Sequence, residues 1–182
     1  MAYHSEFTEF NASICSMALL PLKTKFRGPA PTQMDQNAQD IIDESIYLFK
    51  SLVFFKNFEI QSDADRVLMY LVLYIIECLK LLQKCSNRLQ GEKELNSLGI
   101  ANFSMPGDPG FPQELSNFYL KPKDINEREK LKAYMQQLRQ EMSSRIIEKI
   151  FPGSASEPPS KWWMCFSKKK FLDKALSNPG RF

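Results

Sequence analysis

The sequence predicts an all-α, single compact domain of about five helices packed around one buried central helix. Three observations favour this fold class. Residues 67–76 are all apolar, and a helix that is apolar on every side must be surrounded by protein. Other segments repeat apolar residues at helical spacing, and none alternates as a half-buried strand does. A chain of 182 residues, 43% of them hydrophobic, is large enough to bury such a core.

Residues 1–34 are expected to be extended and to wrap across a helical body formed by residues 35–182. Pro21 keeps the short apolar segment 17–22 off a central strand, because proline cannot donate to the ladder. The sequence GPAP at 28–31 then forbids helix.

A first helix is expected over residues 40–54, where four apolar residues recur at positions i, i+4, i+7 and i+11. The acidic residues Asp40, Asp43 and Glu44 occupy its other side. Such a cluster could hold a cation or carry out acid–base chemistry. A solvated helix face is the favoured interpretation.

The central helix is expected over residues 62–85. Ser62 is placed as its N-cap, and Asp65, three residues later, completes a capping-box pattern. The apolar run is only about half of the ~20 residues that a membrane-spanning helix needs, and charged residues flank it. The helix is therefore predicted to lie in a protein core.

The next part of the chain is predicted to be rich in loops. A short helix is expected over residues 92–98, with Gly99 as its C-terminal cap. Residues 103–112 contain three prolines, which exclude regular structure there.

Two more helices are expected towards the C-terminus. A long one, over residues 124–151, has Asp124 as its cap and Glu127 three residues later. A last helix is expected over residues 161–176, with Ser160 as its cap.

The sequence is poor in catalytic groups. Its only histidine is His4, in a terminus expected to be mobile, so Ser-His-Asp and Cys-His systems have no base to work with. The seven glycines form neither of the common phosphate-binding patterns, and the four cysteines form no closely spaced pair. We therefore expect no enzyme, no cofactor and no metal site, and cysteines that remain reduced in the cytosol.

The C-terminal tail is the strongest signal outside the core. Residues 161–182 carry a net charge of +5, whereas residues 1–160 carry −2. Three large aromatic residues within 162–166 lie next to the lysines at 168–170. Such a mixture can stack on nucleic-acid bases or lie on a membrane surface as an amphipathic helix. Burial in the core and a protein interface are the more frequent roles, so the residues alone indicate a helical binding or assembly module.

Seven short segments, in order along the chain, carry a family resemblance. They are 53–60 (VFFKNFEI), 82–85 (LQKC), 90–94 (QGEKE), 98–100 (LGI), 109–112 (PGFP), 133–141 (AYMQQLRQE) and 159–163 (PSKWW). Together they resemble the family of subunit 3, the 21-kDa subunit, of the actin-related protein 2/3 complex. The resemblance spans nearly the whole chain, and the mass of 21.1 kDa agrees with it.

The resemblance implies a non-catalytic subunit of a seven-subunit assembly that nucleates branched actin filaments. In that family the subunit is a helical body docked on actin-related protein 3, and ATP is bound by the two actin-related proteins. On activation actin-related protein 2 moves beside actin-related protein 3, and contacts made only then would stabilise the active arrangement. The implied location is the cytoplasmic actin cytoskeleton, at the cell cortex and in cell projections.

The interface residues are a hypothesis built on this resemblance. Polar and basic side chains are expected to face acidic actin-like surfaces, with one of two adjacent tryptophans as a partly exposed anchor. Phe54, Phe55 and Phe58 are instead expected in the core. The proposed interface residues are Lys56, Asn57, Lys161, Trp162, Trp163, Lys168, Lys169 and Lys170.

The alternative is a small module that binds nucleic acid or a membrane surface through the basic aromatic C-terminal helix. It predicts RNA binding with a steep salt dependence, or co-sedimentation with anionic vesicles. The family resemblance implies neither nucleic-acid binding nor membrane insertion.

Overall fold

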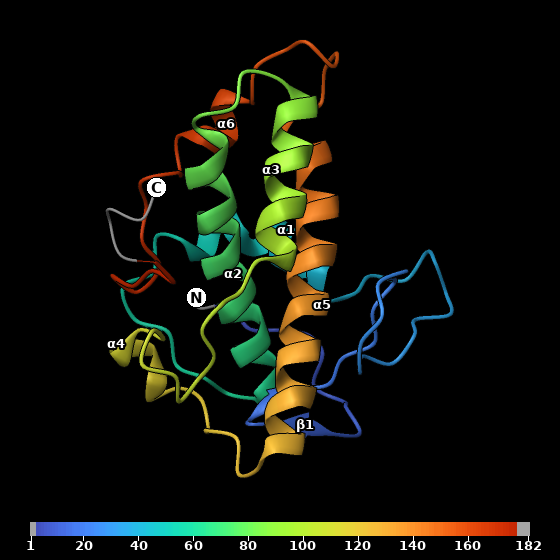
Figure 1. The fold of residues 1–182 in the computed structure, drawn as a ribbon, viewed down its shortest axis with the longest axis vertical. Helices are drawn as coiled ribbons and strands as arrows, with labels where there is room; N and C mark the ends of the chain where they lie inside the picture. Colours follow the sequence, from blue (N-terminus) through green and yellow to red (C-terminus); the bar gives the residue numbers. More distant parts are fainter. Residues whose placement is uncertain (1–2, 178–182) are drawn as a thin grey trace.

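Three long helices stand side by side in Figure 1: α2 (Asp63–Leu82), α3 (Arg88–Ile100) and α5 (Ile125–Ile150). α3 runs antiparallel to α5 and packs along it, and α1 (Ile41–Leu52) lies behind and contacts both α2 and α5. This computed structural model describes residues 3–177. It also contains two short helices, α4 (Gln113–Ser116) and α6 (Lys161–Met164), and an antiparallel hairpin of β1 (Ser13–Ile14) and β2 (Met17–Ala18). The arrangement confirms the all-α fold class, with α4 as a short helix that the sequence did not predict.

The central position of α2 is confirmed. Every residue from 67 to 79 is buried, because α1, α3, α5 and the β-hairpin cover it from different sides. Ser62 is its N-cap, and its hydroxyl accepts a hydrogen bond from the Asp65 N–H at 3.3 Å. Since an Ala in place of such a cap costs about 1 kcal/mol, this residue helps to fix where α2 begins.

The second half of the predicted capping box is wrong, because the Asp65 carboxylate has other partners. It accepts the backbone N–H of Gln61 at 2.9 Å and that of Ser5 at 2.8 Å, and it lies 2.8 Å from Nδ1 of His4. Asp65 is fully buried and thereby joins the N-terminal segment to the start of α2. The only histidine in the chain is part of this junction.

The N-terminal segment is extended and packs on the helices. The hairpin turn is made by Cys15 and Ser16, both with positive φ, and the apolar residues that follow it are buried. The Tyr134 hydroxyl on α5 donates to the Ala18 carbonyl at 2.7 Å and accepts the Leu20 N–H at 3.2 Å. The backbone of this segment is therefore hydrogen-bonded to the helical body rather than to a larger sheet.

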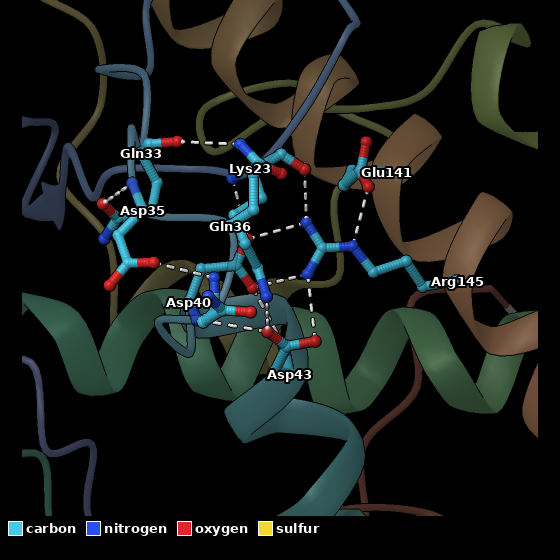
Figure 2. A network of polar contacts seen from close by, with 9 residues as sticks. Lys23, Gln33, Asp35, Gln36, Asp40, Asp43, Glu141 and Arg145 are labelled. Atoms are coloured by element: carbon cyan, nitrogen blue, oxygen red, sulfur yellow. Dashed lines mark hydrogen bonds and ion pairs between the residues drawn. The ribbon is translucent and has the colours of Figure 1, made fainter.

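The acidic residues at the start of α1 are not a solvated face, so that prediction is wrong. Asp40 is the N-cap of α1 and forms a reciprocal capping box with Asp43. Figure 2 shows the Arg145 guanidinium, from α5, pointing at both carboxylates. Its Nη1 and Nη2 donate to the two Asp40 oxygens at 2.6 and 2.7 Å, and Nη1 reaches Asp43 at 3.1 Å. The cluster is an ion-pair network that joins α1 to α5.

Further contacts complete this Arg145 network. Arg145 Nε donates to Glu141 at 2.7 Å, Nη2 donates to the Lys23 carbonyl at 2.6 Å, and Lys23 Nζ pairs with Asp43 at 2.7 Å. Burial acts to raise the pKa of Asp43, but the hydrogen bonds from Lys23 and the Asp40 N–H, with the charge of Arg145, hold it below its ordinary value. No local sequence pattern indicates Arg145 as the partner, because Arg145 lies about a hundred residues from Asp40.

Glu44 follows Asp43 on α1, and its pKa is shifted in the opposite direction, which gives a testable prediction. One of its carboxylate oxygens accepts the Glu6 N–H at 3.2 Å, and the other has no partner within residues 3–177. Burial raises the pKa of Glu44, against the opposing effect of the nearby Ser5 hydroxyl and the Glu6 N–H. Ionised Glu44 is therefore unfavourable in the folded state.

We expect Glu44→Gln to raise the free energy of unfolding by about 1 kcal/mol at pH 7. A carboxyl whose pKa is raised by folding stabilises the protein in acid, and this contribution is lost as the pH rises through the folded-state pKa. The gain from Glu44→Gln should therefore vanish below about pH 4. Urea denaturation at both pH values measures it, with the exposed Glu148→Gln as control. A gain of equal size at both pH values would contradict the assignment.

The prediction for the helix over residues 92–98 is too short. Asn87 is the N-cap of α3 and accepts the Gln90 N–H at 3.0 Å, so the helix begins at Arg88. Gly99 lies inside the helix and is not its cap. A Cβ at Gly99 would lie 3.4 Å from Cα of Gln140, so the absent side chain permits the close packing of α3 on α5.

The long helix α5 is confirmed with almost the predicted bounds. Asp124 is its N-cap and accepts the Glu127 N–H at 2.8 Å. As in α2, the acidic residue three positions later accepts from the residue before the cap: the Lys123 N–H donates to Glu127 at 2.6 Å. The helix ends at Ile150, just before Pro152, which cannot continue it.

Candidate protein-interaction surface

The predicted helix over residues 161–176 is wrong, because α6 ends at Met164 and Ser160 makes no side-chain cap. The chain then turns, with Leu172 and Asp173 both at positive φ. A continuous helix would place Lys170 on the same face as the buried Trp163, seven residues earlier. The turns instead bury Phe171 and Leu172 while they expose the neighbouring lysines.

The two adjacent tryptophans have opposite environments. Trp163 is buried and stacks on Phe49 of α1, with ring centroids 5.7 Å apart, and Lys50 Nζ lies 4.5 Å from the centre of its ring. Trp162 is 80% exposed. Of the two candidate anchors, the structure therefore exposes Trp162 and places Trp163 in the core.

Phe54 is 61% exposed, so its predicted place in the core is wrong. It lies in the turn just after α1, and its ring meets that of Phe166 edge to face, with centroids 5.8 Å apart. Lys169 Nζ lies 5.2 Å from the centre of the Phe54 ring. Phe58 is buried as expected, and Phe55 is half-buried.

The contacts of Phe54 bring the two predicted groups of polar residues towards each other, since Lys56 and Asn57 follow it in the chain. All six polar residues of the predicted interface are exposed. We group them with two exposed aromatic side chains under the name aromatic–lysine surface. Its members are Phe54, Lys56, Asn57, Lys161, Trp162, Lys168, Lys169 and Lys170.

Sequence reasoning missed Phe54 and also Tyr47, which is exposed on α1. A signal for Tyr47 was present, because it lies off the apolar stripe that begins at Ile42. Phe54 lies beyond the end of α1, so the stripe does not extend to it. No comparable signal separates Phe54 from the buried phenylalanines around it.

Potential metal ligands and thiols are the other candidate functional groups of the described residues. Within residues 3–177 no three potential ligand residues gather into a metal site. All four cysteines are unpaired, and burial raises the pKa of Cys15 to about 11 and that of Cys78 to about 12, so neither is a thiolate at neutral pH. In the same part of the chain, no helix has the length and apolar character to cross a bilayer.

The fold and the exposed surface are typical of an α-helical subunit that acts through contacts with other proteins. Comparison with known proteins agrees with this class. A family model described as P21-Arc, the ARP2/3 complex ARPC3 (21 kDa) subunit, matches residues 1–176. The chain therefore belongs to the P21-Arc family, which confirms the resemblance found in seven sequence segments.

Relatives from distant organisms match over almost their full length. A protein named "Probable actin-related protein 2/3 complex subunit 3" from Caenorhabditis elegans is 42% identical, over 98% of this chain and 97% of the relative. Proteins named "Actin-related protein 2/3 complex subunit 3" are 45% identical in Schizosaccharomyces pombe and in Saccharomyces cerevisiae. In each case the match covers 96% of this chain and 99% of the relative.

Proposed function

We propose that the protein is a non-catalytic structural subunit of the actin-related protein 2/3 complex, which nucleates branched actin filaments. It docks on actin-related protein 3 and helps to stabilise the active arrangement, in which actin-related protein 2 lies beside actin-related protein 3. Its other partners are the remaining subunits and the actin filament. It acts in the cytoplasmic actin cytoskeleton, at the cell cortex and in cell projections. Membership of the P21-Arc family supports this assignment.

One observation carries the role in binding: Trp162 is almost fully exposed beside the buried Trp163. Tryptophan is strongly enriched among the residues that dominate interface energies. Exposed lysines follow it in the chain, and one of them, Lys169, lies 5.2 Å from the centre of the exposed Phe54 ring. This mixture of lysines and exposed aromatic rings suits an acidic protein partner with an apolar pocket. Positive charge at the rim would speed encounter with such a partner and make the encounter sensitive to salt.

The mechanism is a shift of population between two arrangements of the complex. A contact changes this equilibrium only if it is stronger in one arrangement than in the other. Contacts worth about 2.7 kcal/mol and present only in the active arrangement would shift the equilibrium about 100-fold. A few well-packed side chains can supply that difference, so a subunit with no chemistry of its own can promote nucleation.

The alternative of a membrane-binding or nucleic-acid-binding helix loses its main support. The membrane interpretation depends on a continuous basic amphipathic helix over residues 161–176, whereas α6 comprises only Lys161–Met164. The nucleic-acid interpretation depends on aromatic rings free to stack on bases, whereas Trp163 is buried. Of the exposed lysines that follow α6, Lys168 lies in a turn, and Lys169 and Lys170 lie in irregular chain.

The experiment replaces Lys168, Lys169 and Lys170 with glutamate in a reconstituted complex. We expect branched nucleation in a pyrene-actin assay to fall at least tenfold at equal complex concentration, because three charge reversals oppose an acidic partner. The circular dichroism melt should not change, since all three side chains are exposed. The control reverses three exposed lysines elsewhere, Lys93, Lys130 and Lys149. Unchanged nucleation by the first variant, or equal loss in both, would contradict the proposed interface.

A further inference from the structure

A cleft lies between the end of α2, the segment that leads into α4, and residues 167–177. Figure 1 shows α4 beside α2. The outer part of the cleft is a groove of about 1060 Å³ between residues 109–114 and residues 167–177. Its inner part is a recess of about 170 Å³, which shares five wall residues with the groove. We call the two parts together the lysine cleft.

Arg139, on α5, lines the inner recess and is only 6% exposed. Its guanidinium lies between the rings of Tyr74 and Phe103, each centred 4.6 Å from Cζ. Its Nη2 donates to the Leu98 carbonyl at 2.9 Å, and its Nη1 lies 3.5 Å from the Tyr70 hydroxyl.

Two features of Arg139 set it apart from an ordinary structural arginine. No carboxylate lies within ion-pair distance of it in residues 3–177, whereas Arg145 on the same helix pairs with three. Its Nε–H also has no acceptor in that part of the chain. A buried charge without a counter-ion and an unpaired buried donor each cost free energy, which an acceptor in the recess would offset.

The groove extends this positive character outwards. Across groove and recess, six cationic side chains face three carboxylates. Of the carboxylates, Glu77 is already occupied, since Lys80 Nζ lies 2.9 Å from it and the Ser177 hydroxyl donates to it. The lysines at 168–170 are exposed and form no ion pair with any residue the structure describes.

We propose that the lysine cleft binds a small polyphosphorylated anion, with phosphate groups along Lys168, Lys169 and Lys170 and one directed into the recess towards Arg139. Arginine and lysine are the usual protein donors to phosphate. A concave site with room for several phosphate groups favours such a ligand over a single small anion, and the groove is as large as typical small-molecule sites. This site goes beyond the proposed assembly role and does not depend on it.

The test is titration calorimetry of the full chain with inositol hexakisphosphate at physiological salt. Replacing Lys168, Lys169 and Lys170 with glutamine should weaken binding at least tenfold. Replacing Lys93, Lys130 and Lys149 with glutamine removes the same charge from surfaces outside the cleft and should weaken it less than twofold. Arg139→Lys, checked for folding by circular dichroism, should weaken it at least fivefold. No binding by the unchanged protein, or equal loss in both triple variants, would overturn the proposal.

Two further arms identify the source of the phosphate and exclude a protein ligand. Phosphatidylcholine vesicles with phosphatidylinositol 4,5-bisphosphate are compared with phosphatidylserine vesicles of equal surface charge. Binding to the first only supports a lipid headgroup, and binding to the soluble ligand without vesicle binding supports a free polyphosphate. Equal binding to both vesicles, or tighter binding of an acidic peptide than of inositol hexakisphosphate, overturns the proposal. Because no other subunit is present, binding of inositol hexakisphosphate can be measured whether or not the assembly role is correct.

Discussion

Replacing Arg145 with leucine is expected to lower the free energy of unfolding by about 3–5 kcal/mol, since it leaves buried carboxylates without their counter-ion. Asp40 is fully buried, and Arg145 is the cation that holds both of its oxygens. Glu141 and Asp43 lose a partner in the same change. Each kcal/mol corresponds to about 2–4 °C for a chain of this size, so the melting temperature should fall by roughly 10 °C.

The matched control for Arg145 is Arg88→Leu on α3. Arg88 pairs with Glu92 at 2.7 Å, as short a contact as those of Arg145, but both side chains are partly exposed. An exposed pair of this kind contributes at most about 1 kcal/mol. Equal losses in the two variants, measured by urea denaturation, would show that burial of the Arg145 network does not determine its strength.

A second variant separates the buried charge from the lost packing. Asp40→Asn keeps a side-chain acceptor at the N-cap of α1 but removes the charge. In the Arg145→Leu background it should recover part of the lost stability, whereas alone it should destabilise the protein. This coupling, obtained from a double-mutant cycle, should be about 1–3 kcal/mol. Additive effects would contradict the ion-pair account.

The same network predicts a pH dependence. Folding lowers the pKa of Asp43, so this carboxylate contributes stability above its unfolded-state pKa. That contribution is lost as the pH falls through the folded-state pKa. The difference in stability between the unchanged protein and Arg145→Leu should therefore shrink below about pH 4.

The sequence predicted those elements that local patterns determine. The all-apolar run of α2 requires burial, and Ser62 and Asp124 provide side-chain acceptors next to helical sequence. The Gly99 cap was predicted wrongly because glycine serves two purposes that look alike in a sequence. It can end a helix, or it can let another helix approach closely, as Gln140 of α5 does here.

The remaining errors concern contacts between segments far apart in the chain. Nothing near Asp40 indicates that Arg145 will neutralise it, so a solvated face was the reasonable expectation. The predicted helix over 161–176 had good local helical character, but tertiary burial of Phe171 and Leu172 decided the backbone instead. The exposed lysines could be identified from composition, whereas their neighbour Phe54 could be placed only once the turn after α6 was known.

The two adjacent tryptophans offer the sharpest test of the aromatic–lysine surface. Trp163→Ala removes a buried ring that stacks on Phe49, and we expect it to lower the free energy of unfolding by about 3–5 kcal/mol. Trp162→Ala removes an exposed ring and should change stability by less than about 0.5 kcal/mol.

If Trp162 is an anchor of the proposed interface, its replacement should have the larger effect on binding, although it has the smaller effect on stability. Trp162→Ala should then weaken association with a complex lacking this subunit by about 2–4 kcal/mol, or roughly 30- to 1000-fold in affinity. Leu89→Ala on α3 removes another exposed apolar side chain and should leave the affinity unchanged. Titration of labelled subunit into the depleted complex measures all three variants. Because Trp162 contributes little to the isolated fold, a loss of affinity without a loss of stability can come only from a partner that covers it. Unaltered affinity would remove Trp162 from the interface and leave the lysines as its only support.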